Sequence, residues 1–184
     1  MPWGGGASSA GLAEYRRPQL LDLSGHDRSS FDCGEESLDE WLKRYAGRSR
    51  RGNTAATWVI VDADDVVVVY ASLSMTAVDR SALPKALAKG APNPVPALLI
   101  GRLAVDRRHA RQGLGTALVA HALATATDLN ERTACRAVVV TAINECSRQW
   151  WEGLGVEPFE PGDSGALDLY LLTSDIEATL AQLR

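Results

Sequence analysis

One stretch of this chain, residues 99–118, constrains its fold more than any other. A run of branched apolar residues ends at Asp106, a basic loop follows, and from Leu114 the apolar residues recur at helical spacing. This pattern predicts a strand, a loop and a helix. Gly113 and Gly115 stand where the helix begins, and without a β-carbon they let the backbone come close to a ligand. Because the first amides of a helix have no internal partner, we expect this helix start to bind an anion such as a pyrophosphate.

Several kinds of phosphate site could use these glycines. A dinucleotide-binding fold requires a third glycine where this chain has Leu118. A nucleoside-triphosphate loop requires Gly-Lys followed by Ser or Thr, and the chain contains no such sequence. The glycines therefore predict a pyrophosphate site of another kind than these two. The alternative is that they serve only the packing of the helix start.

The size and composition of the chain are typical of one globular domain. It has 184 residues, of which 46% are hydrophobic and 23% are charged. We expect residues 16–184 to form this domain and the glycine-rich residues 1–15 to be a flexible tail. Three separated cysteines imply no disulfide framework and no metal site, which suits a reducing compartment. The longest apolar run, 66–71, is too short to span a bilayer, so we predict a cytoplasmic protein without a membrane segment.

The rest of the chain alternates strand and helix patterns. Besides the strand that ends at Asp106, the expected strands are 16–23, 54–62, 66–78, 136–142, 156–159 and 166–172, with 54–62 and 66–78 paired in an antiparallel hairpin. Besides the helix that starts at Leu114, the expected helices are 37–51, 82–88, 144–154 and a final helix that ends at 183. The four prolines between 79 and 96 exclude a central strand there. The order predicts a mixed α/β sheet with helices on both faces.

Two helix starts carry capping signals. Ser37 and Glu40 have the form of a capping box at the start of the helix at 37–51. Ser174 or Asp175 is expected to cap the final helix.

Basic residues gather at the end of the helix at 37–51 and in the loop around 107–111, although the net charge of the chain is −4. Cations favour the C-terminus of a helix, so a solvated helix end explains the first cluster as well as phosphate binding does. If the clusters bind nucleic acid, they contact phosphates, which give affinity without sequence specificity.

Two motifs resemble those of a known family. Residues 102–106, Arg-Leu-Ala-Val-Asp, followed by the Gly-x-Gly loop at 113–115, resemble the acetyl-CoA motif of the GNAT superfamily of N-acetyltransferases. Residues 144–155 resemble the second motif of this superfamily, Asn-x-x-Ala-x-x-Phe-Tyr-x-x-x-Gly. The sequences Phe-Asp-Cys-Gly at 31–34 and Asn-Pro-Val-Pro at 93–96 make the chain similar to GNAT toxins of toxin–antitoxin pairs, which acetylate aminoacyl-tRNA. The resemblance spans about residues 20–172.

The resemblance implies a GNAT acyltransferase fold, acetyl-CoA as cosubstrate and no metal ion. It implies that backbone groups of Leu103 and Val105 hold the pantetheine arm and that Asn144 contacts this arm. The pyrophosphate would contact the loop residues Arg111, Gln112, Gly113, Leu114, Gly115 and Thr116.

The resemblance also implies macromolecular partners. These are tRNA as the substrate and a ribbon-helix-helix antitoxin as the neutralising protein, while a homodimer and a monomer are both left open. The basic side chains that we expect to bind tRNA are Lys43, Arg44, Arg48, Arg51 and Arg102.

The chain departs from the family pattern at two places. The family's general acid is the tyrosine of Phe-Tyr, where this chain has Trp151, and an indole N–H cannot deliver a proton to a thiolate. We therefore expect Trp151 to pack and orient, and Tyr170, or Ser147 with a water, is a candidate substitute acid. In the loop, Ala110 and Arg111 stand where the family has Arg or Gln and then Gly.

Three functions remain open. The first is acetylation of the amino group of aminoacyl-tRNA by a translation-blocking toxin. The second is an acetyl-CoA-binding protein with weak or no catalysis that acts through a partner. The third is an acetyltransferase for small amines, in which the basic clusters are only solvated surface. A steep salt dependence of RNA binding favours the first.

Overall fold

The computed structural model of the chain describes residues 14–160 and 167–182. The strands in these residues are β1 (Gln19–Leu20), β2 (Ala56–Val61), β3 (Val67–Val78), β4 (Val95–Val105), β5 (Ala137–Thr141), β6 (Glu157–Pro158) and β7 (Asp168–Leu172). The α-helices are α1 (Glu36–Glu40), α2 (Ala46–Arg51), α3 (Lys85–Ala88), α4 (Leu114–Arg132), α5 (Glu145–Gly153) and α6 (Thr173–Gln182). A π-helical turn, η3 (Trp41–Tyr45), joins α1 to α2, and 3-10 turns form at η4 (Arg80–Ala82) and η5 (Arg107–His109).

The strands are hydrogen-bonded in the order β1-β2-β3-β4-β5-β7-β6, with β4 and β5 parallel and the β2–β3, β5–β7 and β6–β7 pairs antiparallel. This mixed sheet confirms the predicted fold class. The chain clusters into two compact units, whose described parts are residues 14–74 with 101–121 and residues 75–100 with 122–160 and 167–182. Strands β3 and β4 each continue from one unit into the other.

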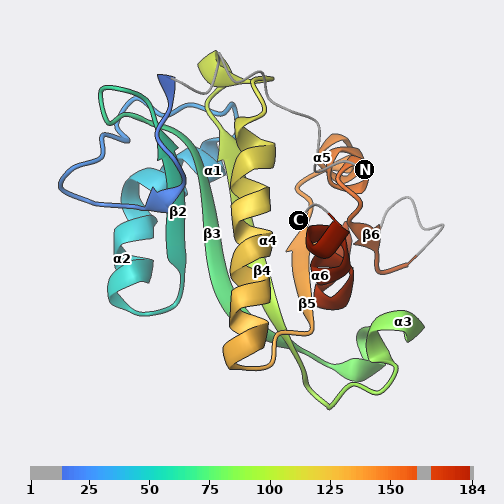
Figure 1. The fold of residues 1–184 in the computed structure, drawn as a ribbon. Helices are drawn as coiled ribbons and strands as arrows, with labels where there is room; N and C mark the ends of the chain where they lie inside the picture. The colour runs from blue at the N-terminus through green and yellow to red at the C-terminus, as the bar shows by residue number, and fades with distance from the viewer. Residues whose placement is uncertain (1–13, 161–166, 183–184) are drawn as a thin grey trace. The chain divides into compact units, whose positions relative to one another are not determined.

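In the first unit, β2 and β3 form the predicted antiparallel hairpin, from Ala56 opposite Leu73 to Val61 opposite Val67. Side chains on one face of these strands pack against the α1–η3–α2 helix in a cluster that contains Phe31, Trp41, Leu42, Ala46, Val59, Val61, Val67 and Tyr70. Other side chains of these strands pack against the start of α4 in a cluster that contains Ile60, Val68, Val69, Ala71, Leu114 and Leu118. Successive side chains of a strand point to opposite faces, so the run of apolar residues buries both sides. The paired strands β2 and β3 are seen side by side in Figure 1.

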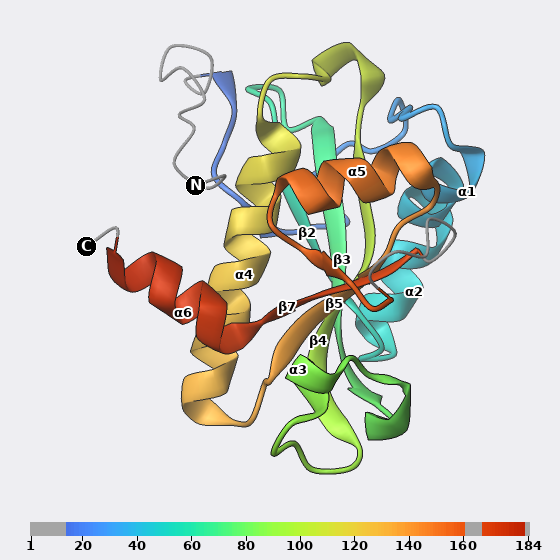
Figure 2. The ribbon, with the colours of Figure 1, turned by 90° about the vertical axis from the view of Figure 1, so that its right-hand side faces the viewer.

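In the second unit, β5 lies between β4 and β7, and β7 also pairs with β6 (Figure 2). A cluster around Leu87 of α3 includes Ala97, Ala137, Val139 and Tyr170. The hydroxyl of Thr173 donates to the carbonyl of Cys135 at 2.6 Å, and Asn130 Nδ2 donates to Glu177 Oε1 at 2.9 Å. These contacts join the start and the middle of α6 to the end of α4 and the segment before β5.

Two predictions at the first helix and strand are wrong in detail. Helix α1 begins at Glu36 after Glu35, which makes no side-chain cap, so Ser37 lies inside the first turn and the capping box does not form. Instead Asp39 Oδ1 accepts a hydrogen bond from the backbone N–H of Cys33 at 2.9 Å. Strand β1 has two residues, far fewer than the expected 16–23.

Two further boundaries differ. Strand β4 begins at Val95 and includes Pro96, within the segment expected to contain no central strand, although β4 lies between β3 and β5. Proline is tolerated because it is the second residue of the strand, where its carbonyl still accepts from the N–H of Arg136 at 3.0 Å. Helix α6 begins at Thr173, so Ser174 and Asp175 lie in its first turn and neither is its cap. Residues 1–13 of the expected tail and the expected ends at 166 and 183 lie outside the described residues.

The described residues contain no helix long and apolar enough to cross a membrane. Within the same ranges, no group of three or more His, Cys, Asp or Glu side chains is arranged to hold a metal ion.

Candidate functional site

The loop between β4 and α4, residues 107–116, is called the glycine loop here. Arg111 and Gly113 adopt left-handed backbone conformations, with φ of 62° and 79°, on either side of Gln112. The N–H of Ala117 donates to the carbonyl of Gly113 at 2.9 Å, so Gly113 is the N-cap of α4. The next three N–H groups, those of Leu114, Gly115 and Thr116, therefore have no acceptor inside the helix. With the helix dipole they form a cradle for an anion.

Residues 107–116 include three arginines and no acidic residue. Of the three arginines of the glycine loop, Arg107 and Arg108 are paired with Asp32 and Asp106, so among the described residues Arg111 is the one left to attract a diphosphate. Arg111 takes the left-handed conformation at the place where the family has glycine. The departure at this position therefore changes a side chain and leaves the turn in place.

Leu103 and Val105, the residues expected to hold the pantetheine arm, lie at the end of β4. Both are half-buried and pack against the cluster that contains Leu114 and Leu118 of α4. The end of the strand and the start of the helix thus share one apolar core, which holds the glycine loop between two fixed points. The role of the two backbones toward an acyl donor stays a prediction.

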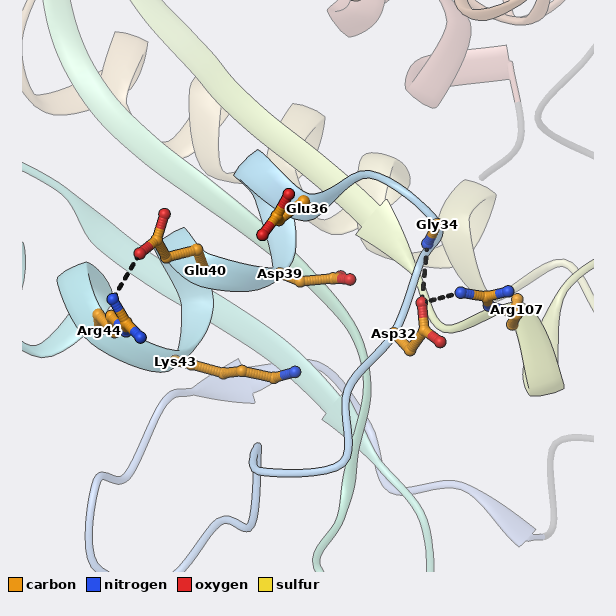
Figure 3. Close-up of a pocket in the computed structure, with 8 residues that line it drawn as sticks. All are labelled: Asp32, Gly34, Glu36, Asp39, Glu40, Lys43, Arg44 and Arg107. Atoms are coloured by element: carbon orange, nitrogen blue, oxygen red, sulfur yellow. Dashed lines mark hydrogen bonds and ion pairs between the residues drawn. The ribbon is translucent and has the colours of Figure 1, made fainter.

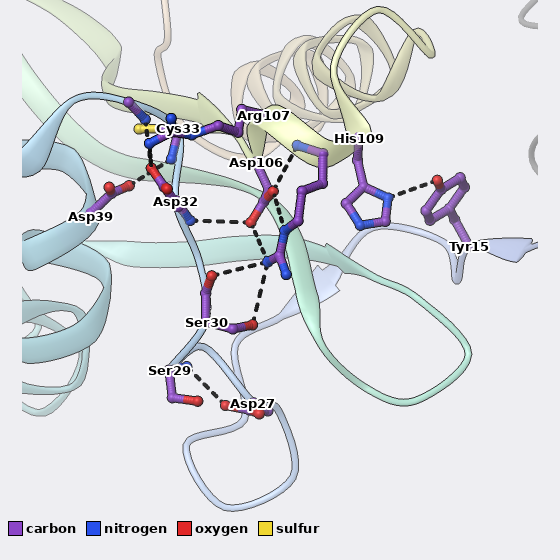
Figure 4. A network of polar contacts seen from close by, with 12 residues as sticks. Tyr15, Asp27, Ser29, Ser30, Asp32, Cys33, Asp39, Asp106, Arg107 and His109 are labelled. Carbon is purple, nitrogen blue, oxygen red and sulfur yellow. Dashed lines mark hydrogen bonds and ion pairs between the residues drawn. The ribbon is translucent and has the colours of Figure 1, made fainter.

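A polar network anchors the entrance to the glycine loop (Figure 4). The Asp106 side chain is fully buried and accepts hydrogen bonds from the backbone N–H groups of Arg108 at 2.9 Å and Asp32 at 3.1 Å. The Arg108 guanidinium donates to the Asp106 carboxylate at 2.7 Å and 2.9 Å and to the carbonyl of Ser30 at 2.9 Å. Arg107 forms an ion pair with Asp32. The network ties residues 30–32 to the first turn of the loop.

The ionisation of Asp106 makes stability depend on acid pH. Burial by itself raises the pKa of Asp106, but hydrogen bonds from Arg108 and from the Asp32 N–H outweigh it and lower the pKa to about 2. The pKa of an unfolded aspartate is about 3.9, so this stabilisation is complete above roughly pH 5 and is lost as the pH falls toward 2.

We expect Asp106→Asn to lower the free energy of unfolding at pH 7 by about 2 kcal/mol. The variant is also expected to reduce the dependence of this free energy on pH between about 5 and 2. Urea unfolding across this pH range measures both effects. Asp64→Asn, which removes an exposed carboxylate, is the matched control, and its free energy of unfolding is expected to depend on pH as that of the parent protein does. An unchanged dependence on pH in Asp106→Asn would contradict the assignment.

A pocket of about 360 Å³ opens beside α1 and η3 in the first unit (Figure 3). It is lined by Gly34, by the cations Lys43, Arg44 and Arg107, and by the carboxylates Asp32, Glu36, Asp39 and Glu40. Arg44 is paired with Glu40 at 2.7 Å, and Arg107 is paired with Asp32. Among the described residues, Lys43 is the lining cation that forms no ion pair. It is the cation of this pocket most available to a phosphate.

The other basic residues expected to bind tRNA differ in their surroundings. Arg48 and Arg51 are exposed on α2. Arg102 is half-buried, and its guanidinium lies 4.7 Å from the centre of the Trp41 ring, which stacks on Tyr70. Arg102 therefore supports the packing of the first unit, and its contact with a substrate stays a prediction.

Asn144, expected to contact the acyl donor, belongs to the second unit and is the N-cap of α5. Its Oδ1 accepts from the backbone N–H of Ser147 at 2.9 Å. The side-chain amide is exposed, and its nitrogen keeps its donors for another partner.

The two residues considered for catalysis also belong to the second unit. Trp151 is buried at 4% exposure and packs edge-to-face against Trp150, with ring centres 4.9 Å apart. Tyr170 is buried as well, and its hydroxyl donates to Glu157 Oε2 at 2.9 Å. Burial and the neighbouring Glu157 raise the pKa of Tyr170 to about 12. Both side chains thus have packing or hydrogen-bond roles inside this unit, and their catalytic roles stay predictions.

Three residues around the glycine loop could not be predicted from the sequence. Asp106 and Asp32 lie inside the motifs at 102–106 and 31–34, but a motif does not reveal which residues form hydrogen bonds with each other. Tyr15, placed at the end of the expected tail, contacts the glycine loop through its hydroxyl. A contact across more than 90 residues leaves no local signal in the sequence.

Comparison with known proteins adds to this geometry. Residues 19–156 match the Acetyltransferase (GNAT) family. The tRNA-acetylating toxin of Mycobacterium tuberculosis is 29% identical over 169 residues, which cover 92% of this chain and 99% of the toxin.

Two solved structures are similar to this chain in fold. The structure of AtaT complexed with acetyl-methionyl-tRNA has a TM-score of 0.81 and 27% identity, covering 91% of this chain and 99% of the other. A tyrosine-to-phenylalanine mutant of the AtaT toxin, bound to the C-terminus of the antitoxin AtaR and acetyl-CoA, has a TM-score of 0.77 and 25% identity. In this second match 91% of this chain and 98% of the other are covered.

Proposed function

Because three quarters of its length match the Acetyltransferase (GNAT) family, this chain belongs to that family, and we propose that it acetylates the amino group of an aminoacyl-tRNA. In this role it acts as a toxin that blocks translation, because an acetylated amino group cannot form the next peptide bond. Translation places the site of action in the cytoplasm.

The observation that carries this proposal is the anion cradle at the start of α4. The three free amides behind Gly113 offer an acyl donor with a diphosphate the donors that it requires. The choice of tRNA as acceptor is supported by the relative that is named for tRNA acetylation and matches almost all of both chains. The similar AtaT structure with acetyl-methionyl-tRNA supports the same choice.

Different residues of this chain bind the acyl donor and promote the transfer. The amides of the glycine loop bind the diphosphate, and the backbones of Leu103 and Val105 orient the arm that carries the acetyl group. The role of Asn144 toward this arm stays a prediction. When bound, acetyl-CoA supplies the thioester carbonyl that the substrate amine attacks. A strand N–H near Val105 would be the donor that stabilises negative charge on this carbonyl oxygen. The amine reacts in its neutral form, and α-amino groups titrate near pH 7.7–8.0, so a useful fraction is neutral at cytoplasmic pH.

An antitoxin of the ribbon-helix-helix class is the proposed protein partner. The similar AtaT toxin has been solved with the C-terminus of its antitoxin AtaR and with acetyl-CoA together. A free C-terminal segment of the antitoxin would therefore be the part that contacts this chain.

A second function is favoured by Trp151. The indole cannot protonate a thiolate, and the side chain is buried against Trp150. Without a general acid the rate falls by about 10²–10⁴-fold. The second candidate is thus an acetyl-CoA-binding protein of weak activity that acts through its antitoxin partner.

The test is acetyl transfer from labelled acetyl-CoA to a pool of charged tRNAs. Uncharged tRNA and small amines such as spermidine are assayed beside it as controls. Label that appears only on charged tRNA supports the tRNA-directed function. Label on the small amines alone rejects it, and binding of acetyl-CoA without any transfer favours the second candidate.

The basic residues on η3 and α2 give a further prediction. The paired change Lys43→Glu and Arg48→Glu is expected to weaken tRNA binding by at least about tenfold and to reduce the slope of log K against log salt by about one to two. The matched control is the paired change Lys89→Glu and Arg132→Glu, at two exposed residues of the second unit, which alters the net charge equally and keeps the salt slope of the parent protein. An equal loss in both variants would assign the effect to net charge and contradict a phosphate contact at η3 and α2.

A further inference from the structure

Tyr15 reaches the glycine loop from the other end of the first unit's sequence. Its hydroxyl lies 2.9 Å from His109 Nδ1 and donates to Gln112 Oε1 at 2.8 Å. Its ring meets the His109 ring edge-to-face, with centres 5.7 Å apart (Figure 4). The hydroxyl thus bridges two side chains of one loop.

The position of Tyr15 is well fixed. Its backbone forms an isolated antiparallel bridge with Asp62, and the next N–H, that of Arg16, donates to the carbonyl of Val61 at 2.9 Å. The ring packs against the cluster that contains Ile60 and Leu118. A hydroxyl held this firmly can orient the side chains that it contacts.

The number of hydrogen-bond donors on Tyr15, His109 and Gln112 determines which of them donates in each contact. A tyrosine hydroxyl has one proton, and here that proton goes to the oxygen of Gln112. The contact with His109 must then use a lone pair of the hydroxyl, so His109 donates from Nδ1. With its oxygen engaged, Gln112 keeps both N–H donors of its amide, and among the described residues no acceptor contacts them. Burial raises the pKa of Tyr15, so the hydroxyl keeps its proton at neutral pH.

Gln112 comes just before the anion cradle in the chain. Gln112 stands between the left-handed residues Arg111 and Gly113, one residue before the N-cap of α4. Its side chain is exposed and starts next to the free amides of Leu114 and Gly115. An amide that offers only N–H groups at this place adds a donor of the same kind as the cradle itself.

We propose that Tyr15 is a positioning residue of the glycine loop, which turns the Gln112 amide so that its N–H groups donate to the diphosphate of the acyl donor. The inference rests on the proposed function only in requiring that the chain binds a coenzyme A ester. It adds a side-chain donor to a cradle made of backbone amides, and it gives the segment before β1 a part in binding. Fixing the Gln112 side chain in advance lowers the entropy lost on binding.

The test is the affinity of the purified full chain for coenzyme A and for pantetheine, which lacks the diphosphate, measured by isothermal titration calorimetry. Tyr15→Phe removes only the hydroxyl and is expected to weaken coenzyme A about three- to tenfold while pantetheine binding stays unchanged. Tyr45→Phe, which removes the hydroxyl of an exposed tyrosine in the same unit, is the matched control and changes neither affinity.

Two variants of Gln112 separate the proposed role from a merely structural one. Gln112→Glu keeps an oxygen to accept from Tyr15 but offers a negative charge in place of the N–H groups, so it is expected to weaken coenzyme A by more than about tenfold. Gln112→Leu removes the hydrogen bond through which Tyr15 acts on the diphosphate. Adding Tyr15→Phe to this variant is therefore expected to cause no further loss of affinity for coenzyme A.

The outcomes are distinct. Failure of the parent protein to bind coenzyme A would overturn the proposed function and this inference with it. Normal binding by the parent protein together with equal affinities in Tyr15→Phe and Tyr45→Phe would overturn the inference alone. An equal loss for coenzyme A and pantetheine would also overturn the inference, because the effect would not involve the diphosphate. A Gln112→Glu variant that binds coenzyme A as the parent protein does would overturn it too, because the N–H groups of Gln112 would then contribute nothing.

Discussion

Replacing Trp151 by tyrosine is expected to raise the rate of acetyl transfer to charged tRNA by about 10²–10⁴-fold, the usual contribution of a general acid. Tyrosine is the residue of the motif that residues 144–155 resemble, and its hydroxyl is expected to protonate the departing thiolate. The gain is expected in kcat, with the KM for acetyl-CoA nearly unchanged, because the change adds a group that acts only in the transition state. Single-turnover transfer at several pH values measures it.

Two control variants separate the effect of a hydroxyl at position 151 from the effect of a smaller side chain. Trp151→Phe makes a similar reduction in size without adding a hydroxyl, so it is expected to give no gain. Trp150→Tyr adds a hydroxyl at the exposed neighbour and is also expected to give none. An equal rise in Trp151→Phe would show that the bulk of the indole limits the reaction, which would reject the missing acid as the cause.

If the unmodified chain is already active, Tyr170 is the residue to test next. Its hydroxyl donates to Glu157, and burial together with Glu157 raises its pKa to about 12. Glu157→Gln keeps an acceptor for this hydroxyl and removes the charge beside it. Activity that is lost in Tyr170→Phe and kept or raised in Glu157→Gln would assign the proton donor to Tyr170. Equal losses in both variants would show that their hydrogen bond only stabilises the second unit.

The parts of the fold that follow from periodicity could be predicted from the sequence. The branched runs at 54–62 and 66–78 predict the hairpin of β2 and β3, because β-branched residues favour strands and only three residues separate the two runs. The start of α4 at Leu114 was predicted correctly, because glycine before a periodic apolar run is a strong local signal.

The first helix could not be predicted with the same accuracy. Ser37 and Glu40 have the spacing of a capping box, but helix α1 begins at Glu36, and Asp39 bonds back to the N–H of Cys33. Several carboxylates and a serine compete for the same few N–H groups there, and the packing of Trp41 and Leu42 in the core selects the register. Tertiary contacts of this kind override a local motif.

The candidate site also contains features that could be predicted from the sequence and features that could not. The glycine loop was predicted because its function depends on the backbone, and glycines report backbone conformation directly. The network of Asp106, Arg108 and Asp32 and the contact of Tyr15 with Gln112 were not predicted. Polar side chains that meet across 74 or 97 residues follow no period, so only the folded structure reveals them.

Replacing Gly113 by valine is expected to weaken acetyl-CoA binding by about 100-fold or more. Gly113 has φ of 79°, a conformation that a β-branched residue adopts only at a cost of about 1–3 kcal/mol. The loop can relieve this strain by leaving the left-handed conformation, and the three amides that follow then no longer converge on one anion. Each hydrogen bond to a charged group is worth about 1.5–3 kcal/mol, so losing even two of them produces an effect of this size.

A second glycine separates the loss of the cradle from the cost of strain. Gly90 also has a left-handed conformation, with φ of 67°, and a β-carbon there would meet no atom within 4 Å. Gly90→Val is therefore expected to lower the unfolding midpoint by a similar amount and to leave acetyl-CoA binding unchanged. Gly113→Asn, whose side chain tolerates left-handed φ, is expected to recover much of the affinity. Unchanged affinity in Gly113→Val, measured below its unfolding temperature, would show that the acyl donor does not bind at the start of α4.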